Sequence, residues 1–268
     1  MDKATVAGIA VSFGGITAGL LLEGGRFSQV LQPTAALIVA GGTVGAVLLQ
    51  FPLSTVITAV GELRNVFFEP RSRASDEIER LTKLAQKARR DGIISLDAEL
   101  PAISDPYMRR ALMLAVDGTE STELRSIMQL ELDASAEAED ELPRVYEAAG
   151  GFAPTIGIIG AVLGLIQVMQ HLDKIDQVGR GIAIAFVATI YGVGFANLIA
   201  LPIAGKLRHR LRIRQTLREL TLEGVISILE GINPRILEAK LTGFLQQAEK
   251  KQQPAQQGAT APRGANQR

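Results

Sequence analysis

The chain has 268 residues, a formal net charge of zero, no Cys and no Trp. The lack of Cys excludes disulfide bonds and thiolate metal sites, and the neutral charge disfavours a dedicated nucleic-acid-binding protein. Hydrophobic residues form 47% of the sequence and aromatic residues only 4%. The hydrophobic residues are clustered, and this clustering determines the expected class of protein.

Four stretches contain no charged residue: residues 4–22, 33–53, 148–170 and 181–205. About 20 helical residues cross the roughly 30 Å hydrocarbon core of a bilayer. Buried helices of a soluble protein are the alternative, but these are usually shorter. The first stretch lacks a clear basic segment and a cleavage site, so we interpret it as a retained helix and not as a signal peptide. The sequence therefore predicts an all-α membrane protein with four transmembrane helices.

Basic residues near the span ends predict the orientation, because cytoplasmic loops carry an excess of Lys and Arg. The short connections 23–32 and 171–180 carry few basic residues, whereas the second and fourth spans lead into many. Both termini and the long segment 54–147 are therefore expected to be cytoplasmic. The residues behind this prediction are Arg64, Arg71, Arg73, Lys206, Arg208, Arg210, Arg212 and Arg214.

The remaining segments are also predicted to be helical. After the spans of residues 1–53, residues 54–147 are rich in Leu, Ala, Glu and Arg, which favour helix. One helix is expected from Ser75 to the Asp91-Gly92 pair, another from Asp105-Pro106, and an acidic helix over 121–142. The spans of 148–205 are followed by C-terminal helices over 206–245, with a break at Ile232-Asn233-Pro234 and an end near Phe244. The Gln-rich tail, residues 246–268, is predicted to be disordered.

Small residues form a stripe on both the third and the fourth span, which allows helices to approach closely. Ordinary packing within one bundle explains most of them. The third span carries Gly157, Gly160, Ala161 and Gly164, and the fourth carries Ala185, Ala188, Thr189, Gly192 and Ala196.

Two prolines lie near the cytoplasmic ends of these spans. Pro154 is expected near a helix start, where proline is tolerated. Pro202 removes a backbone donor well inside its helix and predicts a kink. That kink is either a hinge or simply a feature of the helix shape.

No Asp, Glu, His, Lys or Arg lies in the four spans. Proton paths usually need an intramembrane ionisable group, so such a group would have to come from a partner helix. Thr189 is a candidate to face that partner, although a bond from its hydroxyl to its own helix is the alternative. The other polar side chains of spans three and four include Thr155, Gln167, Tyr191 and Asn197.

Four motifs resemble those of the MotA family of flagellar stator proteins. GGFAPTIGIIGAVLGLI at residues 150–166 is similar to the third-span signature of that family, and AFVATIYG at 185–192 with Pro202 to the fourth-span signature. ARRDGIISLD at 88–97 and AVDG at 115–118 resemble its cytoplasmic motifs. The resemblance extends in order over residues 1–245.

This resemblance implies a homopentamer around a dimer of a MotB-type partner in the bacterial inner membrane. The partner would supply a single membrane helix with the ion-carrying Asp and a peptidoglycan-binding domain. Ion flow would rotate the pentamer, whose cytoplasmic domain would act on the rotor protein FliG through opposite charges. The resemblance implies no cofactor and no metal.

The resemblance also assigns roles to single residues. Pro154 and Pro202 match the two functional prolines of the family, Thr189 matches the Thr beside the ion path, and Thr155 follows the first proline. Ala161 lies where sodium-driven members carry Thr and proton-driven members Ala. The resemblance therefore implies proton drive, which agrees with the inability of a methyl group to coordinate Na⁺.

Three charged residues outside the spans match rotor-facing positions of the family. Arg89 aligns with the rotor-facing Arg, Arg90 is a second candidate, and Asp97 aligns with an acidic position that is often Glu. Charges on exposed helices are more often simply solvated, and surface pairs contribute only about 0–1 kcal/mol. They can nevertheless steer a transient partner.

Two alternatives remain open. An ExbB/TolQ-like energiser of an envelope transport system typically has three spans, so the early pair 4–22 and 33–53 favours the stator. A non-conducting membrane scaffold would differ in ion flux measured with the partner. An enzyme is disfavoured because the sequence has no nucleophile motif, phosphate loop or metal cluster, and only His171 and His209 as imidazoles.

Overall fold

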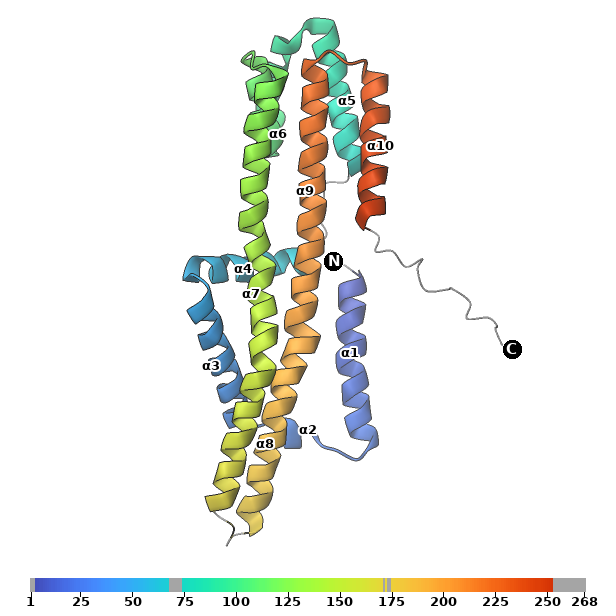
Figure 1. The fold of residues 1–268 in the computed structure, drawn as a ribbon. Coiled ribbons are helices and arrows are strands. Elements are labelled where there is room, and N and C mark those ends of the chain that lie inside the picture. The colour runs from blue at the N-terminus through green and yellow to red at the C-terminus, as the bar shows by residue number, and fades with distance from the viewer. Residues whose placement is uncertain (1–2, 68–73, 171, 173–174, 253–268) are drawn as a thin grey trace, which may run out of the picture. The chain divides into compact units, whose positions relative to one another are not determined.

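The computed structural model describes residues 3–67, 74–170, 172 and 175–252, and these are largely helical, with no strand among them (Figure 1). Internal contacts divide the chain into two compact units. Unit 1 comprises Met1–Pro70 and Ala136–Leu211, and unit 2 comprises Arg71–Ser135 and Arg212–Arg268. Each unit is described separately below.

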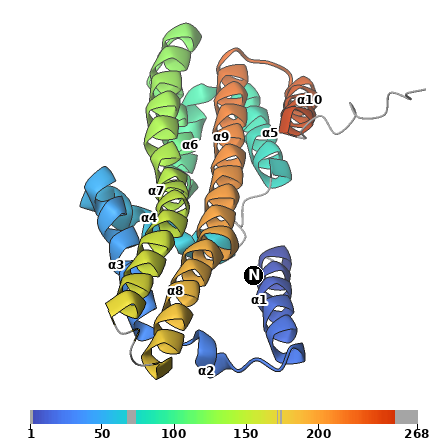
Figure 2. The ribbon, with the colours of Figure 1, turned by 60° about the horizontal axis from the view of Figure 1, so that its bottom comes forward.

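Unit 1 contains the apolar helices. Four helices of the described chain are long and apolar enough to cross a membrane, which agrees with the four predicted spans. In both views α1 and α3 flank the α7–α8 pair on opposite sides (Figures 1 and 2). The helices of this unit are α1 (Lys3–Leu22), α2 (Phe27–Val30), α3 (Pro33–Gln50), α4 (Leu53–Phe67), the last part of α7 (Ser121–Gln170), α8 (Ile175–Phe195), the π-helical turn η2 (Ala196–Ala200) and the start of α9 (Leu201–Leu229).

The second span is shorter than predicted. Helix α3 ends at Gln50 and not at Leu53, because Phe51 is extended (φ −122°, ψ 146°). Phe51 precedes Pro52, and the residue before a proline is disfavoured in the α region. The separate helix α4 then begins at Leu53. Counting uncharged residues cannot detect this turn, since the composition stays apolar through it.

Pro154 does not lie in a first helical turn. The predicted helices 121–142 and 148–170 are parts of one 50-residue helix, α7, which contains both Pro143 and Pro154. The sequence-based reason for tolerating Pro154 was therefore wrong. Proline in a helix interior lacks the N–H that would bond to the carbonyl four residues earlier, here that of Gly150.

A π-helical turn, η2, lies immediately before Pro202, where the sequence predicts a kink. The N–H of Leu201 donates to the carbonyl of Ala196, one residue further back than in an α-helix. Single π turns of this kind are a recognised cause of helix bending and are frequent at functional sites. Helix α9 then continues through Pro202 to Leu229.

Unit 2 is a helical domain around one apolar core. It contains α5 (Ala74–Asp91), the 3-10 helix η1 (Ile93–Ala102), α6 (Pro106–Val116), the first part of α7, the last part of α9, and α10 (Pro234–Gln252). Fully buried side chains from all of these elements meet in the core, including Leu81, Leu96, Met108, Leu124, Ile226 and Leu237.

Two of the helix boundaries predicted for this unit agree with the structure, and the predicted end near Phe244 is wrong. Helix α5 ends at Asp91, and Gly92 has a φ of +86°, which glycine adopts at little cost. The Asp105 carboxylate caps α6 by accepting a hydrogen bond from the N–H of Tyr107 at 2.8 Å. Helix α10 continues past Phe244 to Gln252, into the predicted tail, and residues 253–268 lie outside the described residues.

Candidate functional site

Glycines bring α7 and α8 into backbone contact. A Cβ atom at Gly157 would lie 2.8 Å from the carbonyl oxygen of Ala188, and one at Gly192 would overlap the carbonyl oxygen of Ala153. A Cβ at Gly164 would lie 3.1 Å from the carbonyl oxygen of Gly181. The predicted stripes of small residues are therefore the packing surface between these two helices.

Helix α3 packs against both α7 and α8. A Cβ at Gly160 would lie 2.9 Å from the Cβ of Ala188 and 3.4 Å from Cγ2 of Ile38 on α3. Ala35 and Val39 of α3 pack in one small cluster with Val187 and Ala188 of α8. Gly160 thus lies where three spans meet, and the neighbouring Ala161 is half-buried.

Three of the predicted polar residues of the two spans, Thr155, Thr189 and Asn197, bond within their own span. The Thr189 hydroxyl lies 3.4 Å from the carbonyl oxygen of Ala185, and the Thr155 hydroxyl donates to Phe152 at 2.8 Å. Asn197 donates to the carbonyl of Val193 at 2.9 Å. For Thr189 this is the alternative that the sequence left open. A hydroxyl that donates in this way retains lone pairs on its oxygen, so Thr155, which is exposed, can still accept a hydrogen bond.

The outward faces of the uncharged parts of α7 and α8 are apolar. These parts, within residues 148–170 and 181–205, contain no Asp, Glu, His, Lys or Arg. The exposed side chains include Ile158, Ile159, Val162 and Ile166 on α7 and Phe186, Ile190 and Val193 on α8.

Tyr191 has a role that the sequence did not reveal. Its hydroxyl donates to the carbonyl of Val30 at 2.6 Å and accepts from the N–H of Gln32 at 3.2 Å. It therefore joins α8 to the segment that precedes α3. The signal available in the sequence was general, since a Tyr hydroxyl in an apolar span usually finds a partner.

An ion pair lies just beyond the uncharged third and fourth spans, between α7 and the first part of α9. Arg208 forms two contacts with the Glu147 carboxylate, Nη1 to Oε1 at 2.5 Å and Nη2 to Oε2 at 3.0 Å. A bidentate guanidinium–carboxylate pair has a fixed geometry. It links α7 to α9 just beyond the spans, which the sequence analysis did not predict.

In unit 2, the structure distinguishes between the two arginines proposed to face the rotor. Arg90 makes two hydrogen bonds of 2.9 Å to Asp91, and this partner lowers the pKa of the Asp91 carboxyl. Arg89 and Asp97 are both exposed, and within the described residues no ion pair is found for either. Arg89 is therefore the arginine whose charge is available to a partner.

The segment that carries Asp97 is held against α5. Lys87 of α5 and Glu99 of η1 form an ion pair of 2.5 Å across the turn at Gly92. Ile94, at the start of η1, is 73% exposed. An exposed aliphatic side chain thus lies in the same short segment, between Arg89 and Asp97, and the sequence analysis had not singled it out.

One carboxylate of unit 2 is buried. The Glu77 side chain is 7% exposed, and Thr221 donates to it at 3.2 Å. Burial is the main reason why the pKa of Glu77 is raised above its ordinary value.

Comparison with known families gives two matches that together span most of the chain. Residues 6–92 match the model described as "Motility protein A N-terminal". Residues 99–220 match that of the "MotA/TolQ/ExbB proton channel family". The second match contains the α7–α8 packing surface and the first contains Arg89, whereas Asp97 lies between the two matches.

Individual relatives agree over nearly their whole length. The chain is 35% identical to Motility protein A of Bacillus subtilis, over 91% of both chains. It is 30% identical to chemotaxis protein PomA of Vibrio alginolyticus, over 93% of this chain and 98% of that one.

Two solved structures share the fold. The C. jejuni MotAB structure contains a chain that superimposes with a TM-score of 0.86 at 31% identity, covering 91% of this chain and 96% of that one. For the flagellar MotAB stator complex of Bacillus subtilis the TM-score is 0.84 at 34% identity, covering 94% and 100%. This chain therefore belongs to the Motility protein A group of the MotA/TolQ/ExbB proton channel family.

Proposed function

We propose that this chain is a flagellar motor stator subunit that, with a MotB-type partner, couples proton flow to torque on the rotor. The observation that carries the proposal is a pair of tightly packed spans, residues 148–170 in α7 and the span that begins at residue 181 in α8, without any Asp, Glu, His, Lys or Arg. A proton path there needs a carboxylate from another polypeptide. The names of the relatives support such a partner, since two solved neighbours are MotAB complexes.

The ion path would run beside Thr155, Ala161 and Thr189. Thr155 is exposed and its oxygen retains acceptor capacity, so it can receive a hydrogen bond from water or from a protonated partner carboxyl. Ala161 offers a methyl group, which cannot coordinate Na⁺ as an oxygen ligand would. This difference is the reason for proposing protons as the driving ion.

Pro154 and Pro202 would allow the spans to respond to the partner. Each lies inside a helix and removes one backbone hydrogen bond, and the π-helical turn η2 adjoins Pro202. Local bending at such positions is easier than in an unbroken helix. Protonation of the partner carboxylate would thereby change the shape of α7 and α9 at the same end of the spans.

The rotor contact would use Arg89 and Asp97, with Arg90 in a supporting role. Arg89 and Asp97 present opposite charges on one short exposed segment, and Ile94 adds apolar area between them. Complementary charges mainly accelerate encounter and set orientation. This suits a contact with FliG that must form and break repeatedly.

The proposed setting is the bacterial inner membrane, with both termini in the cytoplasm. Residues 54–147 would then face the rotor, residues 206–245 would form cytoplasmic C-terminal helices, and the chain would form a pentamer around a partner dimer. The excess of Lys and Arg after the second and fourth spans supports this orientation.

The decisive experiment is proton flux into liposomes. The chain co-reconstituted with its partner should conduct protons, and the chain alone should not. Conduction by the chain alone would refute the dependence on a borrowed carboxylate. A silent pair, with the partner active beside another Motility protein A, would instead indicate a non-conducting scaffold. Restored swimming of a stator-deficient strain separates a flagellar stator from an energiser of envelope transport.

A further inference from the structure

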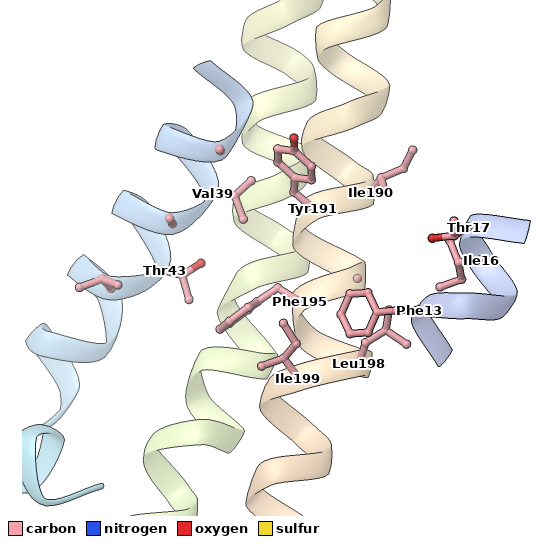
Figure 3. A pocket seen from close by; sticks show the side chains of 14 residues that line it. Phe13, Ile16, Thr17, Val39, Thr43, Ile190, Tyr191, Phe195, Leu198 and Ile199 are labelled. Atoms are coloured by element: carbon pink, nitrogen blue, oxygen red, sulfur yellow. The ribbon is translucent and has the colours of Figure 1, made fainter. Parts of the chain in front are cut away.

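Unit 1 contains two neighbouring apolar cavities along α8. The first has a volume of about 480 Å³ and is enclosed by α1, α3 and α8. Figure 3 shows Phe13 and Ile16 of α1 on one side of it, Val39 and Thr43 of α3 on the other, and Ile190 of α8 between them.

The second cavity, of about 540 Å³, lies beyond the end of α8, along η2 and the start of α9. It is lined by the first half of α1, the end of α4 and the segment from Asn197 to Lys206. Phe13, Leu198 and Ile199 line both cavities, so the two adjoin. Together they form one apolar groove, with α1 on one side and α8, η2 and the start of α9 on the other, which we call the α1–α8 groove.

The groove is too small for another membrane span. A helix with its side chains is about 10 Å wide, so each cavity, of about 480 and 540 Å³, holds roughly one turn, and a span of about 20 residues has several. A span from a second copy therefore does not fit between α1 and α8, although it can still pack on the outer face of α1. A hydrocarbon chain is flexible and much thinner, and it matches the apolar lining.

One end of the groove is basic. Lys206 lines the second cavity directly after the uncharged part of α8 and α9, and its ammonium group has three donors. In the proposed orientation this end faces the cytoplasmic leaflet, where anionic phospholipids attract basic side chains. Apolar walls that lead to a lysine at headgroup depth are the features expected of a lipid site.

We propose that the α1–α8 groove binds an anionic phospholipid, with one acyl chain between α1 and α8 and the phosphate at Lys206. The lipid would fill the space between two spans that otherwise leave cavities. Thr43 lines the first cavity, and its buried hydroxyl has no hydrogen-bond partner in the described structure. Thr43 lines the part of the groove that the acyl chain would occupy, whereas Lys206 lines only the other cavity.

The test is native mass spectrometry of the full-length chain in complex with its partner. The complex is released from vesicles that contain equal amounts of phosphatidylglycerol and phosphatidylcholine. The wild-type complex should retain phosphatidylglycerol in excess. Equal retention of the two lipids would overturn the proposal without any substitution, so the test does not depend on a variant that folds.

Two variants then locate the site. Lys206→Gln should weaken retention of phosphatidylglycerol about fivefold, the effect of one basic residue at an anionic surface. Arg64→Gln is its control and should have a smaller effect, because it removes an exposed charge that does not line the groove.

A second pair of variants tests the cavity itself. Gly8→Leu should fill the second cavity, and Gly14→Leu is its control. A Cβ at either glycine meets no atom within 4 Å, but only Gly8 lines a cavity. Equal effects within either pair would refute this location.

A second readout uses fluorescence. The chain has no Trp, so Phe13→Trp introduces a reporter where the two cavities meet. The signal of the complex without this substitution is subtracted. Brominated phosphatidylglycerol should quench the reporter more than brominated phosphatidylcholine, and Lys206→Gln should abolish the difference. Neither readout involves rotation, so failure here leaves the stator proposal standing.

Discussion

The charge of Arg89 is available to a partner, whereas that of Arg90 is engaged by Asp91. We therefore expect Arg89→Ala to reduce swimming severalfold, because a charge that steers an encounter changes the association rate. Arg90→Ala, the matched control one residue away, should have a smaller effect. Soft-agar expansion at equal membrane levels of the two variants measures this. A larger loss for Arg90→Ala would show that the Asp91 pair opens when the rotor binds.

The buried carboxylate of Glu77 is expected to affect the stability of the protein and not its contact with the rotor. Its raised pKa means that the folded state binds a proton more tightly than the unfolded state. Stability should therefore rise as the pH falls from above the folded pKa towards the ordinary value of 4.5.

Glu77→Gln should retain the bond from Thr221 and remove the cost of burying a charge. We expect the variant to be more stable than wild type by roughly 1 kcal/mol at neutral pH, with the difference shrinking on acidification. Thermal unfolding of the purified complex between pH 7 and 5 measures this. An advantage that grows on acidification would contradict the assigned cause.

At the scale of elements, α7 and α8 pack closely because the glycines at their contact have no Cβ atom. Gly192→Ala places a methyl group against the backbone of Ala153, which cannot move aside as a side chain can. Overpacking of this kind costs about 1–3 kcal/mol, so less folded protein should accumulate in the membrane. Gly194→Ala, on the same helix with no atom within 4 Å, should be neutral. Similar protein levels for both variants would show that α7 and α8 can separate freely.

Pro202 lies next to η2, and Pro202→Ala restores a backbone donor there. The variant should insert normally and yet drive poor swimming, because the helix loses its local break. Membrane fractionation and soft-agar motility distinguish the two effects. Wild-type swimming at a normal protein level would show that the break only shapes the helix.

The boundaries of several elements could be read from local chemistry. Gly92 and Asp105 ended and began helices as expected, because each satisfies a specific backbone requirement. The continuity of α7 could not be read, since a change from acidic to apolar composition resembles an end although the backbone continues. The same limit applies to Phe51, where an apolar turn interrupts an apolar stretch.

At the scale of the whole molecule, the sequence shows directly that the four spans lack Asp, Glu, His, Lys and Arg. It does not show which distant residues form hydrogen bonds or ion pairs in and around the spans. Tyr191 with Val30, and Glu147 with Arg208, join positions far apart in the sequence. No local pattern indicates which distant group completes a hydrogen bond. These contacts became visible only when packing brought the helices together.

The driving ion is a property of the assembled complex. Because Ala161 offers no oxygen ligand, motor speed should follow the proton-motive force and not change with external Na⁺. Bead rotation at fixed proton gradient and varied Na⁺ measures this. Speed that rises with Na⁺ would place the ion ligands elsewhere on α7, α8 or the partner.

The Tyr191 hydroxyl forms hydrogen bonds on both sides of Leu31, because it donates to the carbonyl of Val30 and accepts from the N–H of Gln32. Any turning of α8 about its own axis must therefore carry the start of α3 along or break both bonds. Within one subunit, α8 and the start of α3 should therefore move together. If the proposed ring turns around its partner, the sliding contacts should lie between subunits and against the partner, and not between α8 and the start of α3.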